Sequence, residues 1–71
     1  MIERFYQELG DNIRRMRRMR GLTQSALSSA LDPPMGRTSI ANVENGYQRL
    51  LPHTLVQIAE VLNVKVDKLL P

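Results

Sequence analysis

The 71-residue chain has no cysteine, no tryptophan and only one histidine. Without cysteine it can form neither a disulfide nor a thiolate metal site. His53 has no Cys, His or acidic cluster near it at ligand spacing, so we expect no metal and no other cofactor. At this length a single hydrophobic core is only marginally stable. Stability must therefore come from helix packing, and oligomerisation would add to it.

The chain also lacks long apolar runs and catalytic constellations. No stretch approaches the ~20 apolar residues that span a bilayer, and the opening MIERFYQELG lacks the charged-then-apolar order of a signal peptide. No nucleophile and base, carboxylate dyad or phosphate-binding glycine loop is visible. We therefore expect a soluble protein that is not an enzyme and has neither a membrane partner nor an evident small-molecule ligand.

The positive charge is concentrated in one segment. Ten Lys and Arg face seven Asp and Glu, which gives a net charge of only +3. Five of the ten basic residues lie in the segment RRMRRMR, residues 14–20. Such a segment can follow a phosphate backbone or a membrane surface, or it can simply be solvated.

Hydrophobic periodicity predicts a long first helix over Ile2–Arg20. Four apolar residues at steps of four, four and three mark its inner face, namely Phe5, Leu9, Ile13 and Met16. We expect Met16 and Met19 to fill the core, and a close helix crossing is plausible at Gly10. Arg17 falls on the margin of the apolar face and needs a partner there. Gly21 ends the helix.

The segment from Thr23 to Gly46 reads as two short helices joined by a turn. Thr23 can cap the first of them, whose inward residues are Leu27, Ala30 and Leu31. Pro33 and Pro34 in the run DPPMG, residues 32–36, end that helix. The second covers residues 37–45, with Ile40 and Val43 inward. Its outward residues have the side chains that read base edges, although an ordinary solvated face has the same inventory: Arg37, Thr38, Ala41 and Asn42.

A further amphipathic helix begins at Pro52 and closes at Asn63. Its apolar residues recur at i, i+3, i+4 and i+7, namely Leu55, Ile58, Ala59 and Leu62. Val64 and Val66 return to the core, and a short last helix near Asp67 follows. We expect four leucines in the core, or in part exposed at a dimer contact: Leu50, Leu51, Leu69 and Leu70. His53 is expected at the surface. The sequence thus predicts one all-α domain, residues 1–71, built as a compact five-helix bundle.

Three blocks of sequence resemble the helix-turn-helix domain of phage repressors and Cro, also called the xenobiotic-response-element family. They are LGDNIRRMRRMRGLTQSAL, TSIANVENG and HTLVQIAEVLNVKVDKLL, which together lie between Leu9 and Leu70. The resemblance implies a lambda-repressor-like fold with its helix-turn-helix at about residues 23–46. Two features depart from the family pattern. The turn with Pro33 and Pro34 is about two residues longer than usual, and Leu51 replaces a common Ser cap.

The resemblance also implies roles for individual residues. Arg37, Thr38 and Asn42 match positions that look into the major groove, and Ala41 matches a possible thymine-methyl contact. The positions that match phosphate contacts are Thr23, Gln24, Asn45, Tyr47, Arg49, Arg14 and Arg17. Helix-end amides and the helix dipole would assist Thr23 and Gln24. Arg17 and Glu44 match an ion pair that joins the first and third helices, which would supply the partner that Arg17 needs.

From these features we expect a sequence-specific regulator of transcription that binds double-stranded DNA. It would be a repressor that binds a palindromic operator as a homodimer, in the cytoplasm of a bacterium or encoded by a phage. The alternative is an antitoxin or antirepressor type of protein-interaction module, in which DNA binding is secondary.

Overall fold

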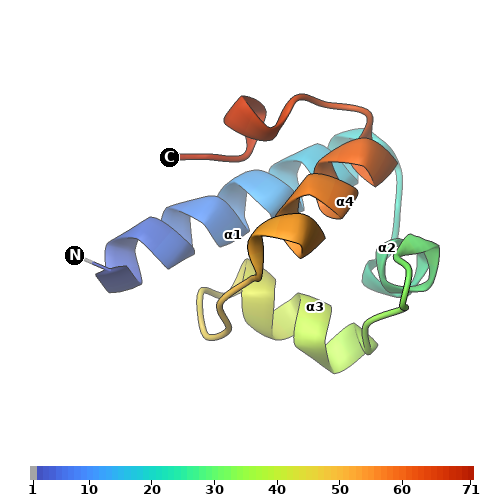
Figure 1. Ribbon diagram of the computed structural model, residues 1–71, viewed down its shortest axis with the longest axis horizontal. Helices are drawn as coiled ribbons and strands as arrows, with labels where there is room; N and C mark the ends of the chain where they lie inside the picture. Colours follow the sequence, from blue (N-terminus) through green and yellow to red (C-terminus); the bar gives the residue numbers. More distant parts are fainter. Residues whose placement is uncertain (1) are drawn as a thin grey trace.

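The computed structural model describes residues 2–71, which contain four α-helices and one short 3-10 turn (Figure 1). They are α1 (Ile2–Met19), α2 (Gln24–Ala30), α3 (Arg37–Glu44), α4 (Pro52–Leu62) and η1 (Val66–Lys68). No strand occurs in these residues, so the all-α prediction is confirmed. The prediction of five helices is wrong, because the last element has only three residues and i to i+3 hydrogen bonds, such as Lys68 N–H to the Lys65 carbonyl at 2.9 Å.

The helix ends follow from local residue chemistry, as predicted. The Thr23 hydroxyl caps α2 by accepting a hydrogen bond from the Ala26 N–H at 3.0 Å. Pro52 occupies the first turn of α4, where its missing N–H leaves no intrahelical bond unmade. Asn63 ends α4 with a positive φ of 56°, and Gly46 follows α3 with a φ of 80°.

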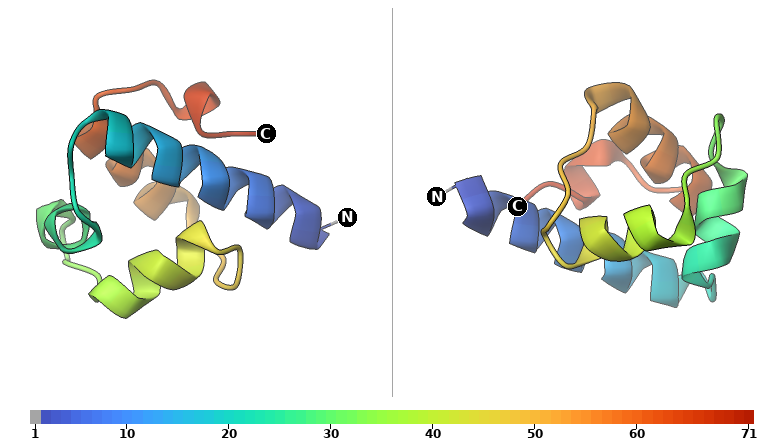
Figure 2. Two further views of the ribbon diagram at one scale, coloured as in Figure 1. Left: turned by 180° about the vertical axis from the view of Figure 1, so that it is seen from behind. Right: turned by 90° about the horizontal axis from the view of Figure 1, so that it is seen from below.

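The core lies between α1, α2, α3 and α4. Its buried apolar residues are Leu9, Ile13, Leu27, Leu31, Ile40, Val43, Ile58, Ala59, Leu62 and Leu69. In Figure 1, α3 forms the lower edge of the molecule, α2 lies at the right, and α1 and α4 lie above α3. From behind, α3 again lies at the lower edge, and from below it faces the viewer between α1 and α4 (Figure 2). η1 is held against α1, where the Asn12 side chain donates to the Leu69 carbonyl at 3.0 Å.

Several residues predicted to lie in the core are instead exposed. Phe5 is 41% exposed, because it belongs to the first turns of α1, and this N-terminal end of the helix extends away from α2 (Figure 1). Met19 is 72% exposed, because a second consecutive step of three from Met16 rotates its side chain off the apolar face. Ala30 is exposed, and Ser28 is buried in its helix with its hydroxyl bonded to the Gln24 carbonyl at 2.8 Å.

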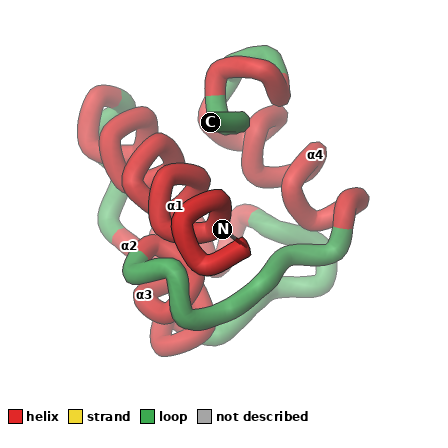
Figure 3. Tube along the Cα trace, turned by 90° about the vertical axis from the view of Figure 1, so that its left-hand side faces the viewer, coloured by secondary structure: helices red, strands yellow, loops and turns green. Residues whose placement is uncertain are grey.

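Two of the four leucines expected in the core or at a dimer contact, Leu50, Leu51, Leu69 and Leu70, also lie outside the core. Leu51 precedes α4 and is 63% exposed, and Leu70 is 40% exposed beside the fully buried Leu69. Leu50 is half-buried against the core. Leu51 lies in the loop that leads into α4, and Leu70 follows η1 near the C-terminus; both segments run over the surface, outside the helices (Figure 3).

α1 and α3 cross at Gly10. A Cβ atom on this residue would lie only 2.6 Å from the Glu44 carbonyl oxygen, so the two backbones are in direct contact. Only glycine allows so close an approach, and the crossing suggested by the sequence is present. None of the helices in residues 2–71 combines the length and the apolar character that a membrane span needs.

Candidate nucleic-acid interface

α3 carries one buried face and one open face. Ile40, Val43 and Glu44 are buried, which fixes the helix to the core. Arg37 and Thr38, in its first turn, are exposed, and Ala41 and Asn42 are half-buried. The four residues predicted to read bases therefore lie on the solvent side of α3 rather than in the core. α3 itself lies along one edge of the molecule (Figure 1).

A buried carboxylate ties α3 to the two helices before it. Glu44 has no exposed surface, and its Oε2 lies 2.6 Å from Arg17 Nε on α1. Its Oε1 accepts from Arg17 Nη2 at 2.9 Å and from Gln24 Nε2 on α2 at 3.1 Å. Arg14 Nε lies 3.4 Å from the same oxygen. One carboxylate thus holds side chains from α1 and α2 against the end of α3.

The electrostatics of this carboxylate follow from its surroundings. Burial acts to raise the pKa of the Glu44 carboxyl, but hydrogen bonds from Arg17, Gln24 and Arg14 and the charge of Arg17 outweigh it, so the pKa lies below its ordinary value. The bond to Glu44 in turn raises the pKa of Arg17 despite the burial of that side chain. Both groups are therefore charged at neutral pH, and each supplies the charge that the other needs in order to be buried.

Arg17 is directed inward and away from solvent. It is only 7% exposed, and its third nitrogen, Nη1, donates to the Leu22 carbonyl at 2.8 Å. The sequence assigned it both an ion pair with Glu44 and a phosphate contact. The structure brings the ion pair together and turns the guanidinium away from the surface, so the phosphate-contacting set proposed below leaves Arg17 out.

The remaining predicted phosphate-contacting residues form two groups. Arg14, Gln24 and Asn45 lie around Glu44, and Arg14 Nη2 donates to Asn45 Oδ1 at 2.7 Å. Thr23, exposed at the N-terminus of α2, precedes Gln24.

The second group follows α3. Tyr47 is 80% exposed, and the Arg49 guanidinium lies over the ring of Tyr6 on α1, 5.5 Å from its centroid. Sequence reasoning missed Tyr6 as a partner of Arg49, because nothing in the local pattern links residues 43 positions apart.

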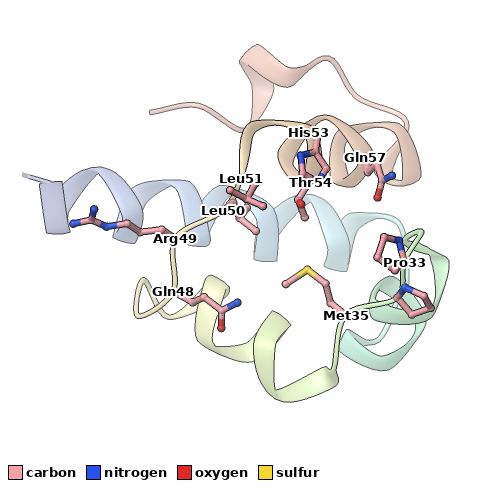
Figure 4. A pocket seen from close by; sticks show the side chains of 10 residues that line it. Pro33, Met35, Gln48, Arg49, Leu50, Leu51, His53, Thr54 and Gln57 are labelled. Atoms are coloured by element: carbon pink, nitrogen blue, oxygen red, sulfur yellow. The ribbon is translucent and has the colours of Figure 1, made fainter.

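The surface formed by residues 2–71 is hollowed in at least two places. One, of about 260 Å³, lies between the α2–α3 turn, the α3–α4 loop and α4, and its lining includes Met35, Leu50 and Thr54 (Figure 4). Another, of about 440 Å³, lies along α1 beside Arg15 and Arg18. Among residues 2–71 no group of three or more His, Cys, Asp or Glu side chains could hold a metal ion.

The fold and this surface define a helix-turn-helix domain, in which α2 and α3 are the two helices of the motif. The model of the family HTH_3: Helix-turn-helix matches residues 13–69, which is most of the chain. The protein therefore belongs to this family of helix-turn-helix domains, which is the xenobiotic-response-element family that the sequence resembles.

Solved structures share the fold at low sequence identity. The DNA-binding domain of BldD is 22% identical and superposes with a TM-score of 0.87 over 100% of both chains. The restriction-modification controller protein C.AhdI from Aeromonas hydrophila is 22% identical, with a TM-score of 0.83 over 90% of both chains.

A third similar structure is a larger protein, the hydroxypropylphosphonic acid epoxidase from S. wedmorenis. It is 25% identical with a TM-score of 0.86, and the match covers 94% of this chain but only 35% of the epoxidase. The same fold thus occurs as one part of an enzyme chain, so the fold alone does not define an activity. Among curated proteins no sequence matches this chain.

Proposed function

We propose that this protein is a sequence-specific DNA-binding regulator of transcription that places α3 in the major groove of double-stranded DNA. The observation that carries the proposal is the division of α3 into an anchored face and an open one. Ile40 and Val43 hold the helix in place, while Arg37 and Thr38 extend from its first turn into solvent. Arg can pair with guanine through two hydrogen bonds, and Thr can contact a thymine methyl. Asn42 and Ala41, one turn further on, would read adenine and a second methyl group.

Phosphate contacts would surround this reading face. Thr23 and Gln24 stand at the N-terminus of α2, where free amides and the helix dipole favour an anion. Beyond the other end of α3, Asn45 is held by Arg14 at 2.7 Å, and exposed Tyr47 and Arg49 follow. Contacts of this kind set the position of a protein on the duplex, and base contacts then provide the specificity.

We further propose that the protein is a repressor that binds a palindromic operator as a homodimer. A single small domain reads few bases, so two copies on half-sites about one helical turn apart, ~34 Å, provide enough specificity. Exposed apolar side chains are available for contact with a second copy, namely Leu51, Val56 and Leu70. A regulator of this kind would act in the cytoplasm of a bacterium, on chromosomal or phage DNA.

Selection from a pool of random duplexes tests the proposal directly. The recovered sequences should share a motif, and the motif should be two-fold symmetric with half-sites about ten base pairs apart. Titration of the selected duplex and of a scrambled one at two salt concentrations adds a control. Charge-driven nonspecific affinity falls steeply with log salt, so the preference for the selected duplex should persist as salt rises. A pool that yields no shared motif would refute the proposal.

A second candidate function is a protein-interaction module of the antitoxin or antirepressor type. The exposed apolar residues Leu51 and Val56 favour it, because they would suit a protein partner as well as a second copy. The two functions differ in the same titration. An interaction module would bind all duplexes weakly, and its binding would be lost as salt rises.

A further inference from the structure

The turn between α2 and α3 is held by a side chain from a different helix. Gln57 on α4 extends toward this turn (Figure 4). Its Nε2 donates to the Asp32 carbonyl at 2.7 Å, and its Oε1 accepts from the Asp32 N–H at 3.3 Å. One side-chain amide thus satisfies both backbone groups of Asp32, the residue that follows the C-cap Leu31 of α2, as a neighbouring strand would.

The turn itself offers few backbone hydrogen bonds. Pro33 and Pro34 lack an N–H, so two of the five residues from Asp32 to Gly36 have no backbone donor. At its far end the Met35 N–H reaches the Ser28 carbonyl at 3.3 Å. Gly36, the N-cap of α3, has no side chain with which to cap the helix. Because the two prolines can donate no backbone hydrogen bond, the bonds from Gln57 to Asp32 fix the first half of the turn.

The two ends of α3 are held very differently. At its C-terminal end Glu44 is buried among three donors, and the backbone touches Gly10 of α1. At its N-terminal end the first inward anchor is Ile40, so Arg37 and Thr38 extend beyond it. The loop that enters this first turn is tied to α4 through Gln57, and at its other end the half-buried Met35 packs against the core.

We propose that Gln57 is a positioning residue for DNA recognition, which fixes the long α2–α3 turn to α4 and so determines how Arg37 and Thr38 enter the groove. The inference rests on the proposed function of α3. Gln57 itself touches no base in this scheme. Its amide acts through Asp32 and the turn, and a loosened turn would let the reading residues sample several orientations. Sequence discrimination would then fall more than affinity for DNA in general.

The test compares two neighbouring substitutions on α4. Gln57→Met keeps the length of the side chain and removes both hydrogen bonds. Ile58→Val is the matched control, because it trims a fully buried side chain of the next residue without touching the turn. It should lower the melting temperature by about 5 °C. For each protein one measures the affinity for the selected duplex and for a scrambled duplex of equal length, and takes their ratio.

Loss of the two bonds in Gln57→Met should lower this ratio about three- to tenfold, which is what one or two exposed hydrogen bonds are worth. The affinity for the scrambled duplex should stay within twofold of that of the wild type, and Ile58→Val should keep the wild-type ratio. A wild-type ratio in Gln57→Met would overturn the inference. An equal fall in both variants would overturn it too, because general destabilisation would then explain the loss.

Amide hydrogen exchange in the free protein separates this inference from the proposed function. The Asp32 N–H should exchange faster in Gln57→Met than in the wild type and at the wild-type rate in Ile58→Val. If the wild type prefers no duplex, the proposed function and the inference fail together, even where Asp32 exchange shows the bond. If the wild type does discriminate but the exchange rate of Asp32 is the same in all three proteins, only the inference fails.

Discussion

Replacing Glu44 with glutamine should destabilise the protein strongly. The substitution keeps the size of the side chain but removes the charge that Arg17 faces at 2.6 Å in a buried position. Breaking a buried ion pair by neutralising one partner typically costs ~3 to 5 kcal/mol. At ~0.05 to 0.15 kcal/mol per residue, a domain of this size has a total stability of roughly 4 to 11 kcal/mol. The substitution should therefore remove roughly a quarter of the stability or more.

Urea denaturation followed by circular dichroism at pH 7 measures this loss. Glu60→Gln is the matched control, because Glu60 is exposed on α4 and the same change of charge there should alter the free energy of unfolding by less than about 0.5 kcal/mol. Thermal melts should agree, with a decrease of roughly 12 °C or more for Glu44→Gln. Equal free energies of unfolding for the wild type and Glu44→Gln would refute the reasoning.

The pH dependence gives the same prediction a second test. The pKa of the Glu44 carboxyl is lowered in the folded state relative to its ordinary value of 4.5. Its contribution to stability is therefore fully present above pH 4.5, and it is lost as the pH falls through the lower folded-state pKa. The difference in unfolding free energy between the wild type and Glu44→Gln should shrink as the pH falls below 4.5. A difference that stays constant down to pH 3 would contradict this account.

Three further predictions concern substitutions at other positions. Arg37→Ala should lower the free energy of binding to the selected duplex by ~1 to 3 kcal/mol and relax the sequence preference, whereas Gln24→Ala should weaken binding to all duplexes alike. Competition binding distinguishes the two variants, and identical behaviour would argue against the assigned roles. Gly10→Ala should lower the free energy of unfolding by at least ~2 kcal/mol, because the added Cβ would meet the α3 backbone. Gly36→Ala should lower it by no more than ~1 kcal/mol, because a Cβ there meets open space. Asn63→Ala should lower the free energy of unfolding by ~1 kcal/mol, because residue 63 has a left-handed φ of 56°, and Asn63→Gly should not lower it. Denaturation of both variants measures the difference.

The sequence predicts those parts of the fold that depend on neighbouring residues. Thr23, Pro52 and Asn63 mark helix ends because capping is a matter of local backbone chemistry. The apolar faces of α3 and α4 follow from periodicity alone. The prediction of a buried Phe5 is wrong because its burial depends on where the other helices lie, which periodicity within α1 does not contain. The exposure of Met19, in contrast, follows from its step along α1 itself.

The candidate site shows the same division. A charged residue at the margin of a core needs a partner, so Arg17 indicated an ion pair from the sequence alone, and the family resemblance named Glu44. The bonds between Gln57 and Asp32 link residues 25 positions apart and have no local signal. Contacts of this kind depend on the geometry of the long turn, and only the folded chain reveals them.

The crossing at Gly10 fixes the C-terminal end of α3 against α1, because the two backbones are in direct contact there. Substitutions in the first turn of α3 can therefore change the exposed surface of that turn without moving the fixed end. The exposed residues Arg37 and Thr38 can therefore be exchanged while the interior stays as it is.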